Sequence, residues 1–272
     1  MLDLLEPYLR DRLVKHGITH PDDLLVHSDV SLAHLLGVSM RTSLRLIRDF
    51  CPAADLWVHN GGITTGLPSL DRAGGLQFGW LVELFGEAGA GKTQLCFSIA
   101  ARATTTHVFW IDSENSFRPN RILDMHANIE NLSVCKCDCL ENLCTIVKSI
   151  PADTRNIIIV DSIAVIAKNT SCILNRQKSL HEFAILCKKT NSVVICTNHV
   201  VADMNNGNSK FKPSLGNTWS HDVTCRICVA IEPEKNESTR KRWIKVIKAP
   251  HIAPESFPIV ISSEAVFETQ TI

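Results

Sequence analysis

The stretch of this sequence most suited to chemistry is Gly86–Thr93, which reads GEAGAGKT. It follows the apolar run WLVELF and precedes QLCFSIAARA, so we expect a strand before it and a helix after it. Glycines let the backbone curl until successive amides point inward, and a helix N-terminus adds positive partial charge. The spacing G-x-x-x-x-G-K-[ST] therefore predicts a phosphate-binding loop in which Lys92 contacts the outer phosphates and the Thr93 hydroxyl binds Mg²⁺.

The predicted loop contributes backbone amides as well as side chains. Together with the start of the helix, it supplies the residues that we expect to contact a nucleoside triphosphate: Gly86, Glu87, Ala88, Gly89, Ala90, Gly91, Lys92, Thr93 and Gln94. The strand before the loop and the helix after it are the context that this motif requires, which makes a chance glycine turn a poor explanation.

Two carboxylates follow other apolar runs. Asp161 ends the run NIIIVD, where an unpaired carboxylate is costly, so we expect a cation beside it and predict that it holds Mg²⁺ through water. Glu114 follows HVFWIDS and is the predicted carboxylate that orients the attacking water. The alternative for Glu114 is an acidic cluster at a helix N-terminus.

The order of apolar runs and amphipathic stretches predicts the elements that position these residues. Short runs rich in β-branched residues, expected to be strands, occupy residues 80–86, 107–114, 156–162 and 192–198. Helices are expected at residues 92–102, 119–129, 141–150 and 177–190. This alternation predicts an α/β fold with a mainly parallel sheet covered on both faces. After about residue 220 only strands are expected, as antiparallel extensions of that sheet at 221–232, 240–249 and 257–263.

The chain divides into three parts by composition. Residues 1–50 indicate a small helical domain, in which Leu9, Leu13 and Val14 recur at helical spacing. Residues 51–62 carry Pro52 and the pair Gly61-Gly62, which is typical of a linker. Residues 63–272 form the predicted α/β core.

The bulk composition limits the classes of function. Lys and Arg together number 28, as do Asp and Glu, so the formal net charge is zero and any nucleic-acid contact must come from local patches. The longest apolar run is too short to span a bilayer, so we expect no membrane partner. The 11 cysteines and the lack of a secretory signal favour free thiols. The spacing of Cys135, Cys137 and Cys139 suggests zinc less well than it suggests buried or half-buried thiols.

Several segments together resemble the RecA-type recombination ATPases. They are ITTGLPSLDRAGGLQFGWLVELFGEAGAGKTQLC, WIDSENSFRPNR, IIIVDS and VVICTNHVV, which occur in family order, and the likeness extends to HGITHPDDLL near the N-terminus. The segments PSLGNTWSHDVTCRICV and KAPHIAPESFPIVISSEAVFE are similar to those of the eukaryotic accessory paralogues of the strand-exchange recombinase. The resemblance implies a RecA-like core, ATP and Mg²⁺ as ligands, and the roles already given to Lys92, Thr93, Asp161 and Glu114.

The resemblance also implies roles for residues that spacing alone does not single out. Arg121, in FRPNR, is expected to stack on adenine. His199 stands where the family commonly has a Gln that senses the γ-phosphate and passes the signal to a DNA-binding loop. The coupling between nucleotide state and DNA binding is therefore expected to differ. Lys248 replaces a usual Asp, and either faces a neighbour's γ-phosphate or is a solvated charge at the end of a strand. The first DNA-binding loop, residues 168–178, looks short.

Two segments are predicted to contact macromolecules. Lys210, Phe211 and Lys212 lie in the expected second DNA-binding loop, where an aromatic ring between two cations suits single-stranded DNA; the alternative is an exposed loop whose Phe tucks back. Phe50 and Ala53 match the F-x-x-A pattern by which the recombinase adds a segment to the next protomer's sheet. The alternative for Phe50 is a side chain that closes the helical domain.

The function implied by the resemblance is that of a nuclear recombinase paralogue. It would be a weak DNA-dependent ATPase that binds ATP and single-stranded DNA and promotes recombinase filament assembly or remodelling in homologous-recombination repair. Its expected partners are the strand-exchange recombinase, other paralogues or a small accessory subunit. The alternative is an adaptor in a paralogue complex, for which ATP hydrolysis is dispensable.

Overall fold

The computed structural model of the chain describes residues 7–16, 36–37, 62–125, 127, 129–170, 173–202, 211–232 and 241–269. The chain separates into two units, residues 1–61 and 62–272. In the first unit, helix α1 (Pro7–Lys15) buries Leu9 and Leu13 and exposes Val14. The rest of the predicted helical domain and almost all of the predicted linker lie outside the described residues, so those domain boundaries stay predictions.

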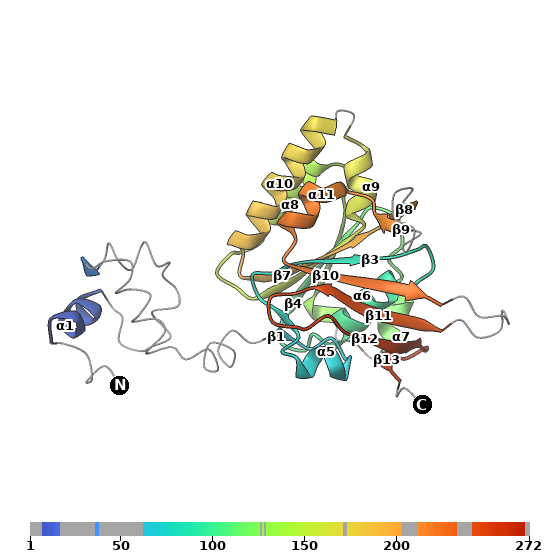
Figure 1. Ribbon diagram of the computed structural model, residues 1–272, viewed down its shortest axis with the longest axis horizontal. Coiled ribbons are helices and arrows are strands. Elements are labelled where there is room, and N and C mark those ends of the chain that lie inside the picture. Colours follow the sequence, from blue (N-terminus) through green and yellow to red (C-terminus); the bar gives the residue numbers. More distant parts are fainter. Residues whose placement is uncertain are drawn as a thin grey trace. The chain divides into compact units, whose positions relative to one another are not determined.

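Nine strands of the described residues form the central sheet of the second unit (Figure 1). In sheet order they are β13 (Val266–Glu268), β12 (Ser256–Ile261), β11 (Arg242–Lys248), β10 (Cys225–Ile231), β3 (Leu81–Phe85), β7 (Ser192–Asn198), β6 (Asn156–Asp161), β4 (His107–Asp112) and β5 (Leu132–Lys136). The strands from β10 to β5 pair in parallel, whereas β11, β12 and β13 pair antiparallel. The predicted fold class of a mainly parallel sheet with antiparallel C-terminal strands is confirmed.

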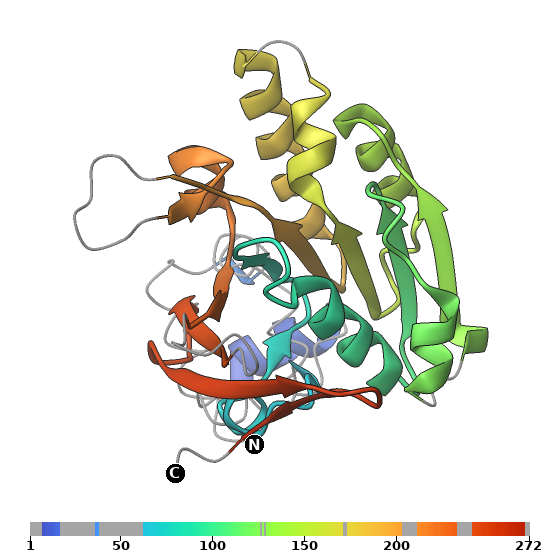
Figure 2. The ribbon, with the colours of Figure 1, turned by 90° about the vertical axis from the view of Figure 1, so that its right-hand side faces the viewer.

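Helices cover both faces of this sheet (Figure 1). One face carries α5 (Pro68–Arg72), α6 (Lys92–Arg102) and α7 (Pro119–Asp124), and the other carries α8 (Leu140–Ser149), α9 (Ile163–Lys168), α10 (Ile173–Lys189) and α11 (Gly216–Asp222). Smaller elements are β1 (Gly62–Ile63), β2 (Leu76–Gln77), the 3₁₀ turn Ile129–Asn131 and the hairpin of β8 (Val200–Ala202) and β9 (Phe211–Pro213). Figure 2 shows this hairpin projecting from the body of the unit. No described helix has the length and apolarity that crossing a bilayer requires.

Each face of the sheet has its own apolar core. On the α6 side, the rings of Phe97 and Trp110 stack with centroids 4.6 Å apart. On the α10 side, Phe183 and Trp219 stack with centroids 6.4 Å apart. The central strands β3, β6 and β7 lie between these layers and are buried along their whole length. Such strands read as continuous apolar runs, which is why the sequence reveals them.

A buried carboxylate attaches α11 to the sheet. Glu83 of β3 has no exposed surface, and it accepts hydrogen bonds from Asn198 Nδ2 at 2.6 Å and Trp219 Nε1 at 2.8 Å. It also pairs with Arg226 on β10. A buried charge needs such partners. Asn198 in turn accepts from Ser214 Oγ at 2.7 Å, so the residues that follow the β8–β9 hairpin are held to the same core.

The structure corrects three expectations about the C-terminal strands. The strand expected at residues 221–232 begins only at Cys225, because His221 and Asp222 are the last residues of α11, which buries Trp219. This strand, β10, is also parallel to β3 rather than antiparallel. The basic run RKRWIK, which begins at residue 240, is typical of a solvated edge strand defended by charge, yet β11 pairs with β10 on one side and β12 on the other.

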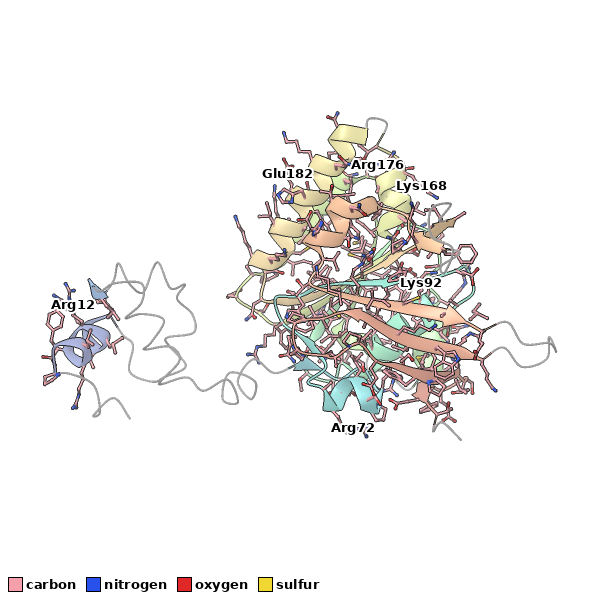
Figure 3. All side chains as sticks on the ribbon, in the orientation of Figure 1. Arg12, Arg72, Lys92, Lys168, Arg176 and Glu182 are labelled. Atoms are coloured by element: carbon pink, nitrogen blue, oxygen red, sulfur yellow. The ribbon has the colours of Figure 1, made fainter. Side chains whose placement is uncertain are left out.

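The segment expected as the first DNA-binding loop, residues 168–178, is mostly helix. Helix α9 ends at Lys168 and α10 begins at Ile173. Arg176 donates to the carbonyl of Thr170 at 2.9 Å across this short connection. Lys168 and Arg176 lie on the outer part of the α8–α11 layer, whereas Lys92 lies at the level of the sheet (Figure 3).

Candidate functional site

The carboxyl ends of the parallel strands meet at one edge of the sheet, and a cavity of about 490 Å³ lies there. Loops that follow β3, β4, β6 and β7 reach this edge because those strands run in the same direction. Edges of this kind, where parallel strands end, are where α/β sheets bind ligands. The residues that line the cavity are Ala88, Gly89, Gly91, Lys92, Thr93, Gln94, Glu114, Asp161, Thr197, His199, Arg242 and Ile261.

The loop between β3 and α6 has the backbone that its glycines predict. Gly89 and Gly91 have φ values of 74° and 111°, in the left-handed region that favours glycine. A Cβ added to Gly86 would lie 2.1 Å from the carbonyl oxygen of Val229, so only glycine fits against β10 there. Helix α6 begins directly after the loop, at Lys92, and directs its free amides toward the cavity.

The ammonium group of Lys92 lies inside the curl of this loop. Its Nζ donates to the carbonyl oxygens of Gly86 and Glu87, both at 2.9 Å. The side chain is buried, and burial lowers the pKa of Lys92 below its ordinary value, whereas the nearby carboxylates of Asp161 and Glu114 oppose that shift. A phosphate in the cavity would stabilise the charged form of Lys92, which burial disfavours.

Asp161 is surrounded by hydroxyl groups at the end of β6. Its Oδ2 accepts from Thr93 Oγ1 at 2.9 Å and from Ser116 Oγ at 2.8 Å, and its Oδ1 accepts from Thr197 Oγ1. Mg²⁺ prefers oxygen ligands and keeps several waters. The structure therefore brings together the hydroxyl of Thr93 and the carboxylate of Asp161, which are the two groups predicted to bind Mg²⁺. Both supply the oxygen atoms that this ion prefers.

Glu114 and His199 meet across the mouth of the cavity. Glu114 Oε1 lies 3.0 Å from His199 Nε2 and also accepts from Ser162 Oγ. Both side chains are about one-third exposed, at 35 % and 36 %, so water reaches them. Asp112 fixes the loop that carries Glu114, because its carboxylate accepts from three backbone amides in residues 114–117. This arrangement fits an oriented carboxylate better than a loose acidic cluster.

Arg121 lies beside the loop, on α7. Its Nε donates to Gln94 Oε1 at 2.7 Å, and its terminal nitrogens donate to the carbonyl oxygens of Ser262 and Ser263 after β12. These hydrogen bonds join α6, α7 and the end of β12. They hold the guanidinium plane in place, which a stacking contact requires, and adenine stacking on Arg121 stays a prediction.

Comparison with known proteins assigns this chain to a family. A family model described as Rad51 matches residues 61–269, which include every residue that lines the cavity. The chain belongs to the Rad51 family. The predicted resemblance to RecA-type recombination ATPases is thereby confirmed.

Curated relatives agree with this membership. The chain is similar to a DNA repair and recombination protein RadA of Cenarchaeum symbiosum, with 24% identity over 98% of this chain and 76% of the relative. It is also similar to DNA repair protein RAD51 homolog 1 of Arabidopsis thaliana, with 26% identity over 75% of this chain and 68% of the relative. DNA repair protein RAD51 homolog 4 of Bos taurus is 23% identical over 88% of this chain and 86% of the relative.

Other predicted residues of this Rad51-family chain lie away from the cavity. Phe211 and Lys212 are exposed on β9, in the hairpin that follows His199, and the Phe211 side chain is 44% exposed. Lys248 directs its Nζ at the carbonyl oxygens of Ser220, at 3.1 Å, and Val223, near the end of α11. Lys248 is exposed at the end of β11, and its role stays a prediction. Lys210, Phe50 and Ala53 lie outside the described residues.

The cysteines do not form a metal centre in the part of the chain that the structure describes, where no cluster of three or more His, Cys, Asp or Glu side chains is arranged to hold a metal ion. Cys135 is exposed on β5, whereas Cys137 is buried after the strand has ended. Cys225 and Cys228 face opposite sides of β10, as expected for a strand.

Sequence reasoning missed several residues of this site. Ser116, Ser162 and Thr197 donate to the carboxylates of Asp161 and Glu114, and Arg242 and Ile261 line the cavity. The hydroxyl residues neighbour predicted ones in sequence, so a search for donors near each strand end finds them. Arg242 and Ile261 come from C-terminal strands, and only the order of strands in the sheet brings them to this edge.

Proposed function

We propose that this Rad51-family chain binds ATP with Mg²⁺ in the cavity, hydrolyses it slowly, and couples its nucleotide state to single-stranded DNA in homologous-recombination repair. The observation that carries this proposal is the convergence of Lys92, Thr93, Asp161 and Glu114 on one cavity beside a glycine loop. The names of the relatives, which describe DNA repair and recombination, support the biological setting.

The chemistry follows from what each side chain can reach. Lys92 exchanges its two carbonyl partners for oxygens of the β- and γ-phosphates, while the amides of the loop hold the same phosphates. Thr93 and Asp161 would hold Mg²⁺, which supplies positive charge to the phosphate oxygens when bound. Glu114 orients a water for attack on the γ-phosphorus and accepts a proton from it, as the bond to the leaving oxygen breaks.

The contact between His199 and Glu114 can couple the state of the bound nucleotide to DNA binding. His199 directly precedes β8, so a change at Glu114 that alters this contact also acts on the hairpin that carries Phe211. Ordering of a loop by a bound triphosphate is a common switching device. We infer that Phe211, flanked by Lys210 and Lys212, stacks on a base of single-stranded DNA.

Partners and setting complete the proposal. The chain would act in the nucleus with the strand-exchange recombinase, other paralogues or a small accessory subunit, and would promote recombinase filament assembly or remodelling. Phe50 and Ala53 are the proposed docking residues for one of these partners.

A second candidate is an adaptor that binds ATP and does not need to hydrolyse it. Two observations favour it. Glu114 Oε1 is already engaged by both Ser162 and His199, and Lys248 is engaged by carbonyl groups of its own chain. A carboxylate that stays engaged with His199 after ATP binds would not orient water.

Measuring ATP turnover and DNA affinity together separates these two functions. We expect single-stranded DNA to raise the turnover of the full chain, and Phe211→Ala to weaken DNA binding by about 5- to 150-fold, because base stacking contributes about 1–3 kcal/mol. Phe267→Ala is the matched control, since Phe267 is 41% exposed on β13 and is expected to leave both quantities unchanged. Saturable ATP binding with no turnover, with or without DNA, would instead establish the adaptor.

A further inference from the structure

The direction of β11 brings an arginine to the mouth of the cavity. Strand β10 runs parallel to β3, and β11 runs antiparallel to β10, so β11 begins at the sheet edge where β3 ends. Arg242 is the first residue of β11, and it pairs with Ile231 at the last position of β10. The same reasoning places the end of β12, Ile261, at this edge.

The Arg242 side chain passes close to the glycine loop. A Cβ added to Gly91 would lie 3.9 Å from Arg242 Cδ and 2.5 Å from Ile261 Cδ1. Arg242 shares a face of β11 with Ile244 and Val246, which are buried, whereas Lys245 is exposed on the opposite face. Arg242 therefore points toward the layer that holds the loop and lines the cavity beside Gly91 and Lys92.

The charges that line the cavity are divided between its two sides. The carboxylates of Glu114 and Asp161 belong to the β4–β6 side of β3, and Arg242 belongs to the β10–β12 side. Lys92 follows β3 and lies between them. A cation bound at Asp161 would meet one flank of a phosphate chain, and the opposite flank would then face Arg242.

We propose that Arg242 binds the phosphate groups of the nucleotide from the side opposite Asp161. Guanidinium groups bind phosphate oxygens through two parallel hydrogen bonds, which makes arginine well suited to this task. The contact deepens the proposed function and rests on it, because it requires a nucleotide in this cavity. It also supplies a second cation from the same chain, so the phosphates do not depend on a neighbouring protomer for that charge.

The test compares the affinities of four proteins for fluorescent ADP and ATP in Mg²⁺: wild type, Arg242→Ala, Arg242→Gln and Lys245→Ala. Loss of a charge-assisted hydrogen bond predicts that both Arg242 variants bind both nucleotides at least about tenfold more weakly. Lys245→Ala removes the same charge from the opposite face of the same strand, and we expect wild-type affinity. Thermal unfolding without nucleotide reports whether each variant is folded; if Arg242→Ala is not, Arg242→Gln decides.

Each outcome bears on a different claim. Wild-type affinity in Arg242→Gln, or an equal loss in Lys245→Ala, would overturn the role of Arg242 and leave the proposed function intact. No binding of either nucleotide by wild type would overturn the proposed function itself, and the role of Arg242 with it.

Discussion

Replacing Lys92 with alanine is expected to lower ATP turnover by about 10²–10³-fold and to weaken ATP binding by at least about tenfold. The ammonium group lies within the loop, 2.9 Å from two carbonyl oxygens that it can exchange for phosphate oxygens. It is therefore expected to stabilise both the bound triphosphate and the charge that develops during hydrolysis. The measurements are steady-state phosphate release and equilibrium binding of a fluorescent nucleotide.

Two controls make this result specific to Lys92. Lys148→Ala removes an exposed lysine of α8, and we expect it to change neither turnover nor affinity. Lys92→Arg keeps the positive charge but does not fit the curl of the loop as an ammonium does, so its turnover should also fall. Unchanged turnover in folded Lys92→Ala would show that hydrolysis does not occur at this loop.

Replacing Glu114 with glutamine is expected to lower turnover by about 10²–10⁴-fold while ATP still binds. Glutamine keeps the shape of the side chain and its contacts with Ser162 and His199, but it does not accept a proton from water. Single-turnover hydrolysis with excess protein, followed by quenching, separates this chemical step from product release. Binding of the fluorescent nucleotide is measured in parallel.

The matched control for this variant is Glu141→Gln, in the exposed first turn of α8, which should leave turnover unchanged. Turnover at the wild-type rate in Glu114→Gln would contradict the role of Glu114 and point to another group as the one that orients water. A loss of ATP binding as large as the loss of turnover would also contradict it, because Glu114 is placed to act on water rather than on the phosphates.

Sequence alone predicts the parts of the site whose chemistry is local. Residues 86–93 carry their own turn, their lysine and the start of α6, and the helix occupies the expected residues 92–102. Asp161 is found because a carboxylate ends a strand buried along its whole length. In both cases a few neighbouring residues determine the local structure, so no knowledge of the rest of the fold is needed.

The remainder depends on contacts between distant parts of the chain. Arg242 reaches the cavity because β10 lies between β3 and β11, and a run of basic residues by itself indicates only an exposed strand. Helix α11 is short, and what holds it is the hydrogen bond of Trp219 to Glu83, 136 residues away in sequence. Lys248 likewise finds its partners on α11. Local composition does not encode such pairings.

A single titration tests the central claim most directly, namely that the loop at Gly86–Thr93 binds ATP. Isothermal titration calorimetry of the purified full chain with ATP in excess Mg²⁺ should give saturable binding of one nucleotide per chain, competed by ADP and weakened in Lys92→Ala. If the folded chain shows no heat of ATP binding, and ATP leaves its thermal unfolding unchanged, residues 86–93 do not form a nucleotide site.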